Sequence, residues 1–233
     1  MTHQHLINDL KKLANPEKAA FFPRFFKAGP GEYGEGDQFL GVIVPDQRKI
    51  AKKYKGLELP EIKKLLHSPI HEHRLTALFI LVNQFQKGDE KQKKEVYEFY
   101  LKNKCHVNNW DLVDSSAHKI VGVYLKDKDR SILYDLAQSP SLWDRRIAMM
   151  SCFTFIREQD FEDALAIAEI LVDDEHDLIH KVVGWMLREI GKRDQGVEEE
   201  FLMQHYQTMP RTMLRYAIEK FTRQKRDFYL GKG

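Results

Sequence analysis

The amino-acid sequence predicts an all-α protein in which pairs of helices stack in series as a helical-repeat solenoid (an α–α superhelix). Apolar residues recur at three- and four-residue spacing over most of the chain, as on a buried helix face, and strand-like alternation is nearly absent. A short motif also recurs at an interval typical of stacked helix pairs, each of which buries its apolar face against its neighbours. We expect one repeat domain over residues 1–233.

The N-terminal part of the chain differs in composition from the rest. Residues 27–41, KAGPGEYGEGDQFLG, hold five of the thirteen glycines and are expected to form a loop. A phosphate-binding loop is disfavoured, because the segment lacks a Gly-Lys-Ser/Thr ending and carries Glu32, Glu35 and Asp37, which would repel phosphate. The loop is interpreted as a connection between the N-terminal helices and the next helix.

After the loop, a helix is expected to begin at Pro45. Pro45 and Asp46 are typical of the first turn of a helix, here in VPDQRKIAKKY. From Leu57 to Phe221 the helical periodicity continues. Boundaries between helices are expected at five stop-and-start signals: Ser68-Pro69, Gly88-Asp89, Ser139-Pro140, Asp173-Asp174 and Gly191.

The recurring motif relates LLHSPIHEHRLTA to DLAQSPSLWDRRIA. At an offset of 71 residues the first segment matches the second at four positions: Ser68 with Ser139, Pro69 with Pro140, Arg74 with Arg145 and Ala77 with Ala148. Half of this offset is a period of about 36 residues, a little short for standard HEAT units. The solenoid is therefore expected to be HEAT-like.

The same register predicts a functional surface. A step of about 36 residues from Arg74 reaches Trp110, and one further helical turn reaches Asp114. The same turn beyond Lys181 reaches Trp185, and equivalent positions in a solenoid line one strip. A single concave surface is expected to combine a carboxylate, two tryptophans and several cations: Asp114, Trp110, Trp185, Arg74, Arg145, Arg146, Lys181, Arg188 and Arg215.

Purely structural roles are the alternative for several of these residues. In NNWDLVDSS, Asn108 or Asn109 is expected to cap the N-terminus of a helix. Asp111 would then lie at the positive end of the helix dipole. Asp114 lies among large apolar neighbours of the same helix, which favours a functional role. Trp185 could instead belong to the core, and the arginines of SLWDRRIAMM could form a solvated patch and not a phosphate clamp.

The histidines do not predict a metal site. His67, His71 and His73 straddle a proline without regular ligand spacing, and His176 and His180 share a helix face but lack a third ligand. No cofactor motif is found either, so neither a metal nor a cofactor is expected.

Composition sets further expectations. The net charge of +2, from 37 basic and 35 acidic residues, means that an electropositive surface can arise only by segregation of charge. Cys105 and Cys152 are isolated, which favours a reducing compartment, and we expect a cytoplasmic monomer. No uncharged apolar run approaches the roughly 18 to 20 residues of a membrane span, and no signal peptide is expected.

Four segments, FLGVIVPDQR, NNWDLVDSS, WDRRIAMM and HKVVGWMLREIGK, resemble in order and spacing the DNA alkylation repair enzymes, the AlkD-like family of HEAT-like-repeat DNA glycosylases. The resemblance implies that Asp114 is the catalytic aspartate and that Trp110 and Trp185 cradle the sugar of the damaged nucleotide. It also implies that Arg146 contacts the DNA backbone and that Phe25 falls near an aromatic position. The chain differs from other members of this family in its glycine-rich loop. It also has Asn109 at a position where some members have a tryptophan.

A single carboxylate is chemically sufficient if the damaged base is already cationic, because its departure then needs no proton donor. We therefore expect excision of N3- or N7-alkylated purines from double-stranded DNA, as in base excision repair. The resemblance also implies that the enzyme need not flip the damaged base into a deep pocket. The alternative is a non-catalytic helical-repeat scaffold that binds DNA or protein.

Overall fold

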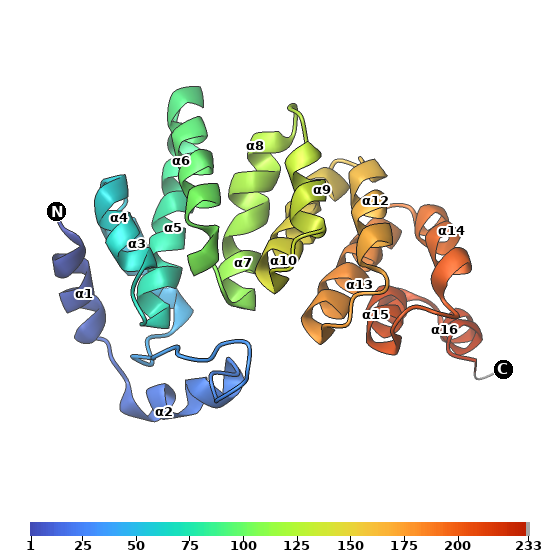
Figure 1. Ribbon diagram of the computed structural model, residues 1–233, viewed down its shortest axis with the longest axis horizontal. Coiled ribbons are helices and arrows are strands. Elements are labelled where there is room, and N and C mark those ends of the chain that lie inside the picture. Colours follow the sequence, from blue (N-terminus) through green and yellow to red (C-terminus); the bar gives the residue numbers. More distant parts are fainter. Residues whose placement is uncertain (232–233) are drawn as a thin grey trace. The chain divides into compact units, whose positions relative to one another are not determined.

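A computed structural model describes residues 1–231, which fold into α-helices with short 3₁₀ and π turns (Figure 1). The contacts between Cα atoms divide the chain into two compact units, which we call unit 1 (Met1–Ile120) and unit 2 (Val121–Gly233). The extended backbone in the described range pairs in one isolated β-bridge, between Gln38 and Ile70. The predicted all-α class is confirmed, and the assignment of a single domain stays a prediction.

Unit 1 is organised around one long buried helix, α5 (His71–Lys87). Because α5 is buried around most of its circumference, it packs against several neighbours at once. Those that contact it most are α3 (Val44–Lys53), α4 (Leu59–Leu66), α6 (Glu90–Lys102) and α7 (Trp110–Ala117). The remaining elements are α1 (His3–Lys11), α2 (Pro16–Phe25) and the 3₁₀ turn η1 (Lys104–His106). The π turn η2 (His118–Gly122) contains the sequence boundary between the units.

Unit 2 is organised in the same way around α13 (Asp177–Gly191). Helices that pack against α13 include α10 (Leu142–Ser151), α12 (Glu162–Leu171), α14 (Gln195–His205) and α15 (Arg211–Ala217). The shorter elements are α8 (Val123–Leu125), α9 (Ser131–Ala137), α11 (Phe153–Ile156), η3 (Ile218–Lys220) and α16 (Arg223–Tyr229).

The helix boundaries follow the predicted signals. Helix α5 ends just before Gly88, and the Asp89 carboxylate accepts the N–H of Gln92 at 2.8 Å to begin α6. Helix α13 ends at Gly191. The turns at Ser68-Pro69, Ser139-Pro140 and Asp173-Asp174 also lie between helices, so local capping chemistry positions the ends of the helices.

The internal repeat has a structural counterpart. Arg74 donates from Nη1 to the carbonyl of Ser68 at 3.0 Å, and Arg145 donates from Nη1 to the carbonyl of Ser139 at the same distance. Each arginine also pairs with an acid outside its own helix, at 2.6 Å for Asp37 and 2.7 Å for Asp174. The matched arginines thus brace the same turn in both units.

The glycine-rich segment forms no helix and packs against the N-terminal ends of α5 and α7. Gln38 donates its N–H to the carbonyl of Pro69, and its own carbonyl accepts the N–H of His71. In Figure 1, α2 runs crosswise to α5, and the following segment returns toward α5 and α7. A Cβ atom on Gly34 would lie 2.6 Å from the carbonyl oxygen of Phe26, so only glycine allows this approach.

None of the helices in residues 1–231 combines the length and the apolar character needed to span a membrane.

Candidate nucleic-acid interface

Helix α7 carries the candidate catalytic acid, and Asn109 determines where it begins. The side-chain oxygen of Asn109 accepts the backbone N–H of Trp110 at 2.9 Å, so Asn109 is the N-cap of α7. The sequence had allowed either Asn108 or Asn109 in this role. Its amide nitrogen donates to the carbonyl of Phe26 at 3.4 Å, and the residue is fully buried. Asn109 therefore links the start of α7 to the end of α2.

Two predicted nucleotide contacts, Phe25 and Trp110, lie together in unit 1. Their ring centroids are 5.7 Å apart in an edge-to-face arrangement. Phe26 lies beneath them and stacks on Trp110 with centroids 5.6 Å apart and an interplanar angle of 21°. Phe25 is 50% exposed and Trp110 is partly exposed, so the pair presents an aromatic surface to solvent.

Asp114 follows Trp110 by one helical turn, so both side chains lie on the same side of α7. Asp114 is partly exposed, whereas Val113 and Ala117 beside it are fully buried in the core of unit 1. The helix thus presents a carboxylate next to an aromatic ring at the surface.

A buried ionic cluster lies behind the aromatic pair and was not identified from the sequence. His71 is 2% exposed and contacts two carboxylates, with Nδ1 2.9 Å from Oδ2 of Asp37 and Nε2 2.9 Å from Oδ2 of Asp111. Burial alone would lower the pKa of His71, but the carboxylates of Asp111 and Asp37 outweigh it and raise this pKa to about 9. The imidazole is therefore charged at neutral pH.

Asp37 has a second cationic partner in Arg74, whose Nη2 lies 2.6 Å from Oδ1. Burial tends to raise the pKa of Asp37, but the contacts with His71 and Arg74 bring it below its usual range. Asp111 thus has a role beyond the expected one at the start of α7, since it also anchors His71. No local spacing could have indicated this cluster, because its members come from three separate segments.

An apolar cavity of about 250 Å³ opens beside the aromatic pair. Its walls come from α2, the loop before α3, the start of α3 itself, α5 and α7, and its lining includes Phe25, Phe26, His71 and Asp111. Oδ1 of Asp111 is buried and has no hydrogen-bond partner within residues 1–231. The cavity lies between the ionic cluster and the surface that carries Phe25.

Two cations of unit 1, Arg48 and Lys119, were not predicted from the sequence as DNA contacts. Arg48 on α3 is exposed and lies over the ring of Phe79, with its guanidinium carbon 4.0 Å from the ring centroid. Burial and then the charge of Arg48 lower the pKa of Lys119. Because the two cations repel each other, an anion that contacted both would be favoured. Arg74, by contrast, is 4% exposed and committed to Ser68 and Asp37.

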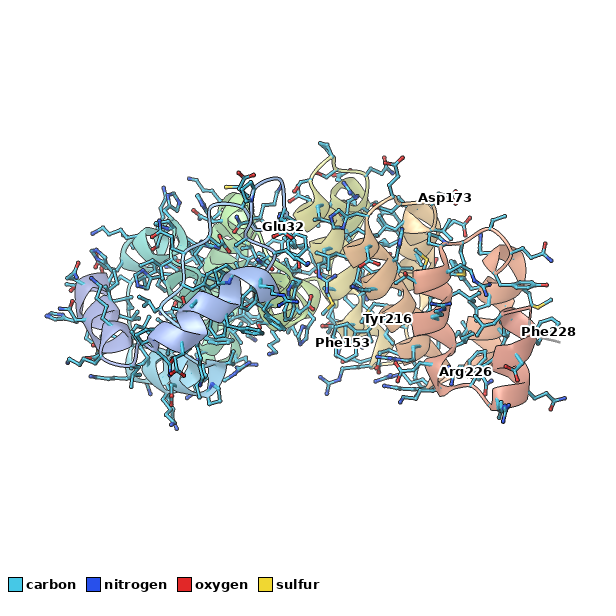
Figure 2. The ribbon with its side chains drawn as sticks, turned by 90° about the horizontal axis from the view of Figure 1, so that it is seen from below. Glu32, Phe153, Asp173, Tyr216, Arg226 and Phe228 are labelled. Carbon is cyan, nitrogen blue, oxygen red and sulfur yellow. The ribbon has the colours of Figure 1, made fainter. Side chains whose placement is uncertain are left out.

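In unit 2, the predicted residues on α13 share one side of the helix, because Lys181, Trp185 and Arg188 are spaced by four and three positions. Trp185 is partly exposed, with its ring centroid 6.1 Å from that of Phe153. In the view of Figure 2, Phe153 and Tyr216 are labelled near each other, and Asp173 lies at the upper edge of unit 2. The side of α13 that carries Trp185 is therefore accompanied by the ring of Phe153.

The cations of unit 2 differ in their availability. Arg215 on α15 is exposed. Arg146 is buried and donates from Nη1 to the carbonyl of Leu178 at 2.6 Å, which ties α10 to the start of α13. The other predicted cations form ion pairs: Lys181 with Asp177, Arg188 with Glu219, and Arg145 with Asp174.

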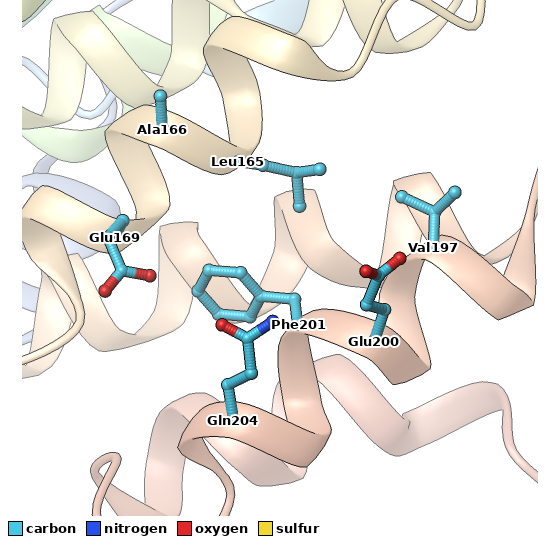
Figure 3. Close-up of a pocket in the computed structure, with 7 residues that line it drawn as sticks. All are labelled: Leu165, Ala166, Glu169, Val197, Glu200, Phe201 and Gln204. Carbon is cyan, nitrogen blue, oxygen red and sulfur yellow. The ribbon is translucent and has the colours of Figure 1, made fainter.

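A second depression, between α12 and α14, has a different character. Figure 3 shows Glu169 and Glu200 on either side of Phe201. Glu169 pairs with His205 at 2.8 Å. Because carboxylates rim this depression, it does not suit a phosphate backbone.

Within the described range, no group of three or more His, Cys, Asp or Glu side chains is arranged to hold a metal ion. The predicted strip shared by Asp114 and Trp185 joins residues of the two units, and it stays a prediction.

Comparison with known proteins supports the fold and identifies the family. The chain resembles a solved structure described as a predicted DNA alkylation repair enzyme from Enterococcus faecalis, with a TM-score of 0.70 and 17% sequence identity, covering 90% of this chain and 97% of the other. This likeness confirms the predicted helical-repeat fold. No curated protein sequence matches significantly. The family model of the DNA alkylation repair enzymes matches residues 6–221, and the chain therefore belongs to the DNA alkylation repair enzyme family.

Proposed function

We propose that the protein is a DNA glycosylase that removes positively charged N3- or N7-alkylated purines from double-stranded DNA, in base excision repair. The observation that carries the proposal is the placement of Asp114 one turn beyond Trp110 on α7, beside an exposed aromatic surface. Membership in a family of DNA repair enzymes supports it. The enzyme would act as a cytoplasmic monomer without a metal ion.

Asp114 would act on the sugar and not on the base. When a cationic base departs, positive charge develops on the sugar, and a nearby carboxylate stabilises it and orients the attacking water. Asp111 is not suited to this role, because one of its oxygens binds the buried imidazole of His71. The aromatic faces of Trp110, Phe25 and, in unit 2, Trp185 would contact the nucleotide that carries the damaged base.

The phosphate backbone would contact cations that reach the surface. Arg215 in unit 2 and Arg48 in unit 1 are exposed, whereas Lys181, Arg188 and Lys119 are partly exposed. Arg74 is left out of the proposed contacts, because a phosphate would have to displace Asp37 from a buried ion pair. Arg145 and Arg146 would act chiefly by bracing α10, since each already binds a backbone carbonyl.

Excision from methylated DNA tests the proposal directly. Wild-type protein and the Asp114→Asn variant are incubated with methylated duplex DNA, and the released bases are identified by mass spectrometry. We expect the wild type to release 3-methyladenine and 7-methylguanine and the variant to lose activity by about a hundredfold or more while still binding DNA. Asp46→Asn, on the exposed side of α3, is the matched control and should retain activity.

Two outcomes would contradict the proposal. If the wild type binds DNA but releases no base, the protein is a non-catalytic scaffold. If it releases uracil from uracil-containing DNA as readily as 7-methylguanine from methylated DNA, the argument that one carboxylate limits the enzyme to cationic bases is wrong.

A further inference from the structure

We propose that His71 is a positioning residue of the nucleotide-binding surface: it joins Asp37 of the glycine-rich loop to Asp111 of α7 and so holds Trp110 and Phe25 in place. The contacts are direct, with each ring nitrogen 2.9 Å from a carboxylate oxygen. His71 lies in the first turn of α5, the helix at the centre of unit 1. Its effect on excision rests on the proposed function, whereas its effect on the surface does not.

The aromatic rings continue the contact from His71 to the surface. The ring of Phe26 lies over the imidazole with centroids 4.5 Å apart, and Trp110 stacks on Phe26. Phe25 contacts both of these residues edge to face, at 4.9 Å and 5.7 Å. Because the rings pack in series, a displacement of His71 would be transmitted to the exposed pair.

The loop is held in place at neighbouring points. The Glu72 carboxylate accepts the backbone N–H groups of Leu40, Gly41 and Val42 at distances from 2.8 to 3.3 Å. A Cβ atom on Gly41 would lie 2.1 Å from the carbonyl oxygen of Asn15, so the loop also packs tightly against the start of α2. Glu72 anchors the end of the loop, while His71 connects the loop to the helix that carries the candidate acid.

The charges around His71 require a protonated ring. The charged groups that act on it are Asp37 from the loop, Asp111 from α7 and Arg74 from its own helix. Glu72, the next residue on α5, binds the loop backbone. Since a carboxylate accepts but does not donate, both ring nitrogens must carry a proton to satisfy both neighbours. A neutral imidazole would place an unprotonated ring nitrogen against Oδ2 of Asp37 or of Asp111, and this contact costs free energy even though Asp37 keeps Arg74 as a donor.

His73 provides a matched control on the same helix. It is 2% exposed like His71, but its Nδ1 lies 2.8 Å from the hydroxyl oxygen of Ser68, and no carboxylate of residues 1–231 contacts it. Burial and then the nearby cations lower its pKa to about 4, so it is neutral at physiological pH. Substituting His73 therefore removes a buried imidazole of the same size without removing a charge.

The first experiment measures protonation without reference to catalysis. The ¹⁵N resonances of the histidine side chains are followed from pH 5 to pH 10 in the wild type and in the His71→Gln and His73→Gln variants. We expect the imidazole assigned to His71 to stay doubly protonated up to about pH 9 and the one assigned to His73 to stay neutral above pH 5. A neutral His71 at pH 7 overturns the inference, whatever the protein does to DNA.

The second experiment measures the consequence at the surface. In a Trp143→Phe, Trp185→Phe background, the fluorescence of Trp110 should shift in His71→Gln and in Asp111→Asn but not in His73→Gln. Single-turnover excision by His71→Gln should be slowed about tenfold or more and should lose the decline that the wild type shows as pH rises through about 9. Circular dichroism verifies that each variant is folded, and Asp111→Asn replaces His71→Gln if the latter does not fold.

The outcomes separate the two proposals. If the wild type excises nothing but His71→Gln shifts the Trp110 fluorescence, the proposed function fails and the positioning role stands. If His71→Gln and His73→Gln change fluorescence, excision and pH profile equally, His71 is only one more buried side chain and the inference is wrong.

Discussion

The side-chain amide of Asn109 donates to the backbone carbonyl of Phe26, so the residue that begins α7 also binds the residue that follows α2. This hydrogen bond brings Phe25 and Trp110 together, although they are far apart in the sequence. The aromatic surface therefore depends on an asparagine at a position where the family resemblance pointed to tryptophan in some members.

Replacing Trp110 with alanine should lower the rate of excision more than it lowers the stability of the folded protein. The ring forms one side of the exposed aromatic pair and is only partly buried, so its loss affects the nucleotide contact most. We expect single-turnover excision of 7-methylguanine to fall about tenfold to a hundredfold, and Trp110→Phe to retain most of it. Phe228→Ala removes an exposed aromatic ring from α16 and serves as control; an equal loss in that variant would contradict the assignment.

Removing Arg48 or Lys119 should lower DNA affinity for all sequences and reduce its salt dependence. Each cation that neutralises a phosphate releases about one counterion, so the slope of log K against log salt should become less steep by about one for each substitution. Fluorescence anisotropy with undamaged duplex DNA at several salt concentrations measures the slope. Lys94→Ala, an exposed lysine paired with Glu98 on α6, should leave it unchanged. An unaltered slope in Arg48→Ala and Lys119→Ala would exclude these contacts.

Substituting Gly184 with alanine should destabilise unit 2. A Cβ atom there would lie 2.3 Å from the carbonyl oxygen of Met213 and 2.6 Å from Cβ of Tyr216, so α13 and α15 would have to separate. We expect a loss of about 1 to 3 kcal/mol in urea unfolding, despite the better helix propensity of alanine. Gly56→Ala, where a Cβ atom would meet no neighbour within 4 Å, is the control. Equal stability of the two variants would show that the helix contact is loose.

Glu198 should make the protein less stable as pH rises. It is 1% exposed, and burial followed by the charge of Glu199 raises its pKa to about 9, so the folded protein holds it protonated. Because the unfolded chain releases this proton near pH 4.5, stability should decline between about pH 4.5 and pH 9, by on the order of 3 kcal/mol at pH 7. Chemical denaturation across this range should show that the decline is smaller in Glu198→Gln. Parallel curves for both proteins would contradict a protonated Glu198.

Much of the fold followed from local patterns. The boundaries at Gly88 and Gly191, the helix that begins near Pro45 and the loop at residues 27–41 all agree with the structure. Capping and turn chemistry act over a few residues, so they can be recognised without knowledge of the tertiary structure. The repeat was also visible, because the turns at Ser68 and Ser139 use the same arginine contact.

The same repeat did not reveal which cations are already paired within the fold. A recurring arginine on a helix face suggested a phosphate contact, whereas Arg74 is buried and braces a turn. A periodic charge marks an equivalent position in each repeat but does not reveal whether an acid from another segment pairs with it. Asp37 supplies that acid from the glycine-rich loop, and Asp174 does the same for Arg145.

By itself the sequence determined the helical class, the helix ends and the side of α7 that carries Trp110 and Asp114, because these depend on periodicity and on neighbours one turn away. Only the tertiary structure decided that Phe25 meets Trp110 and that His71 bridges Asp37 and Asp111. These contacts join segments with no regular spacing between them, and the charge of His71 depends on how burial and two carboxylates balance once the chain has folded.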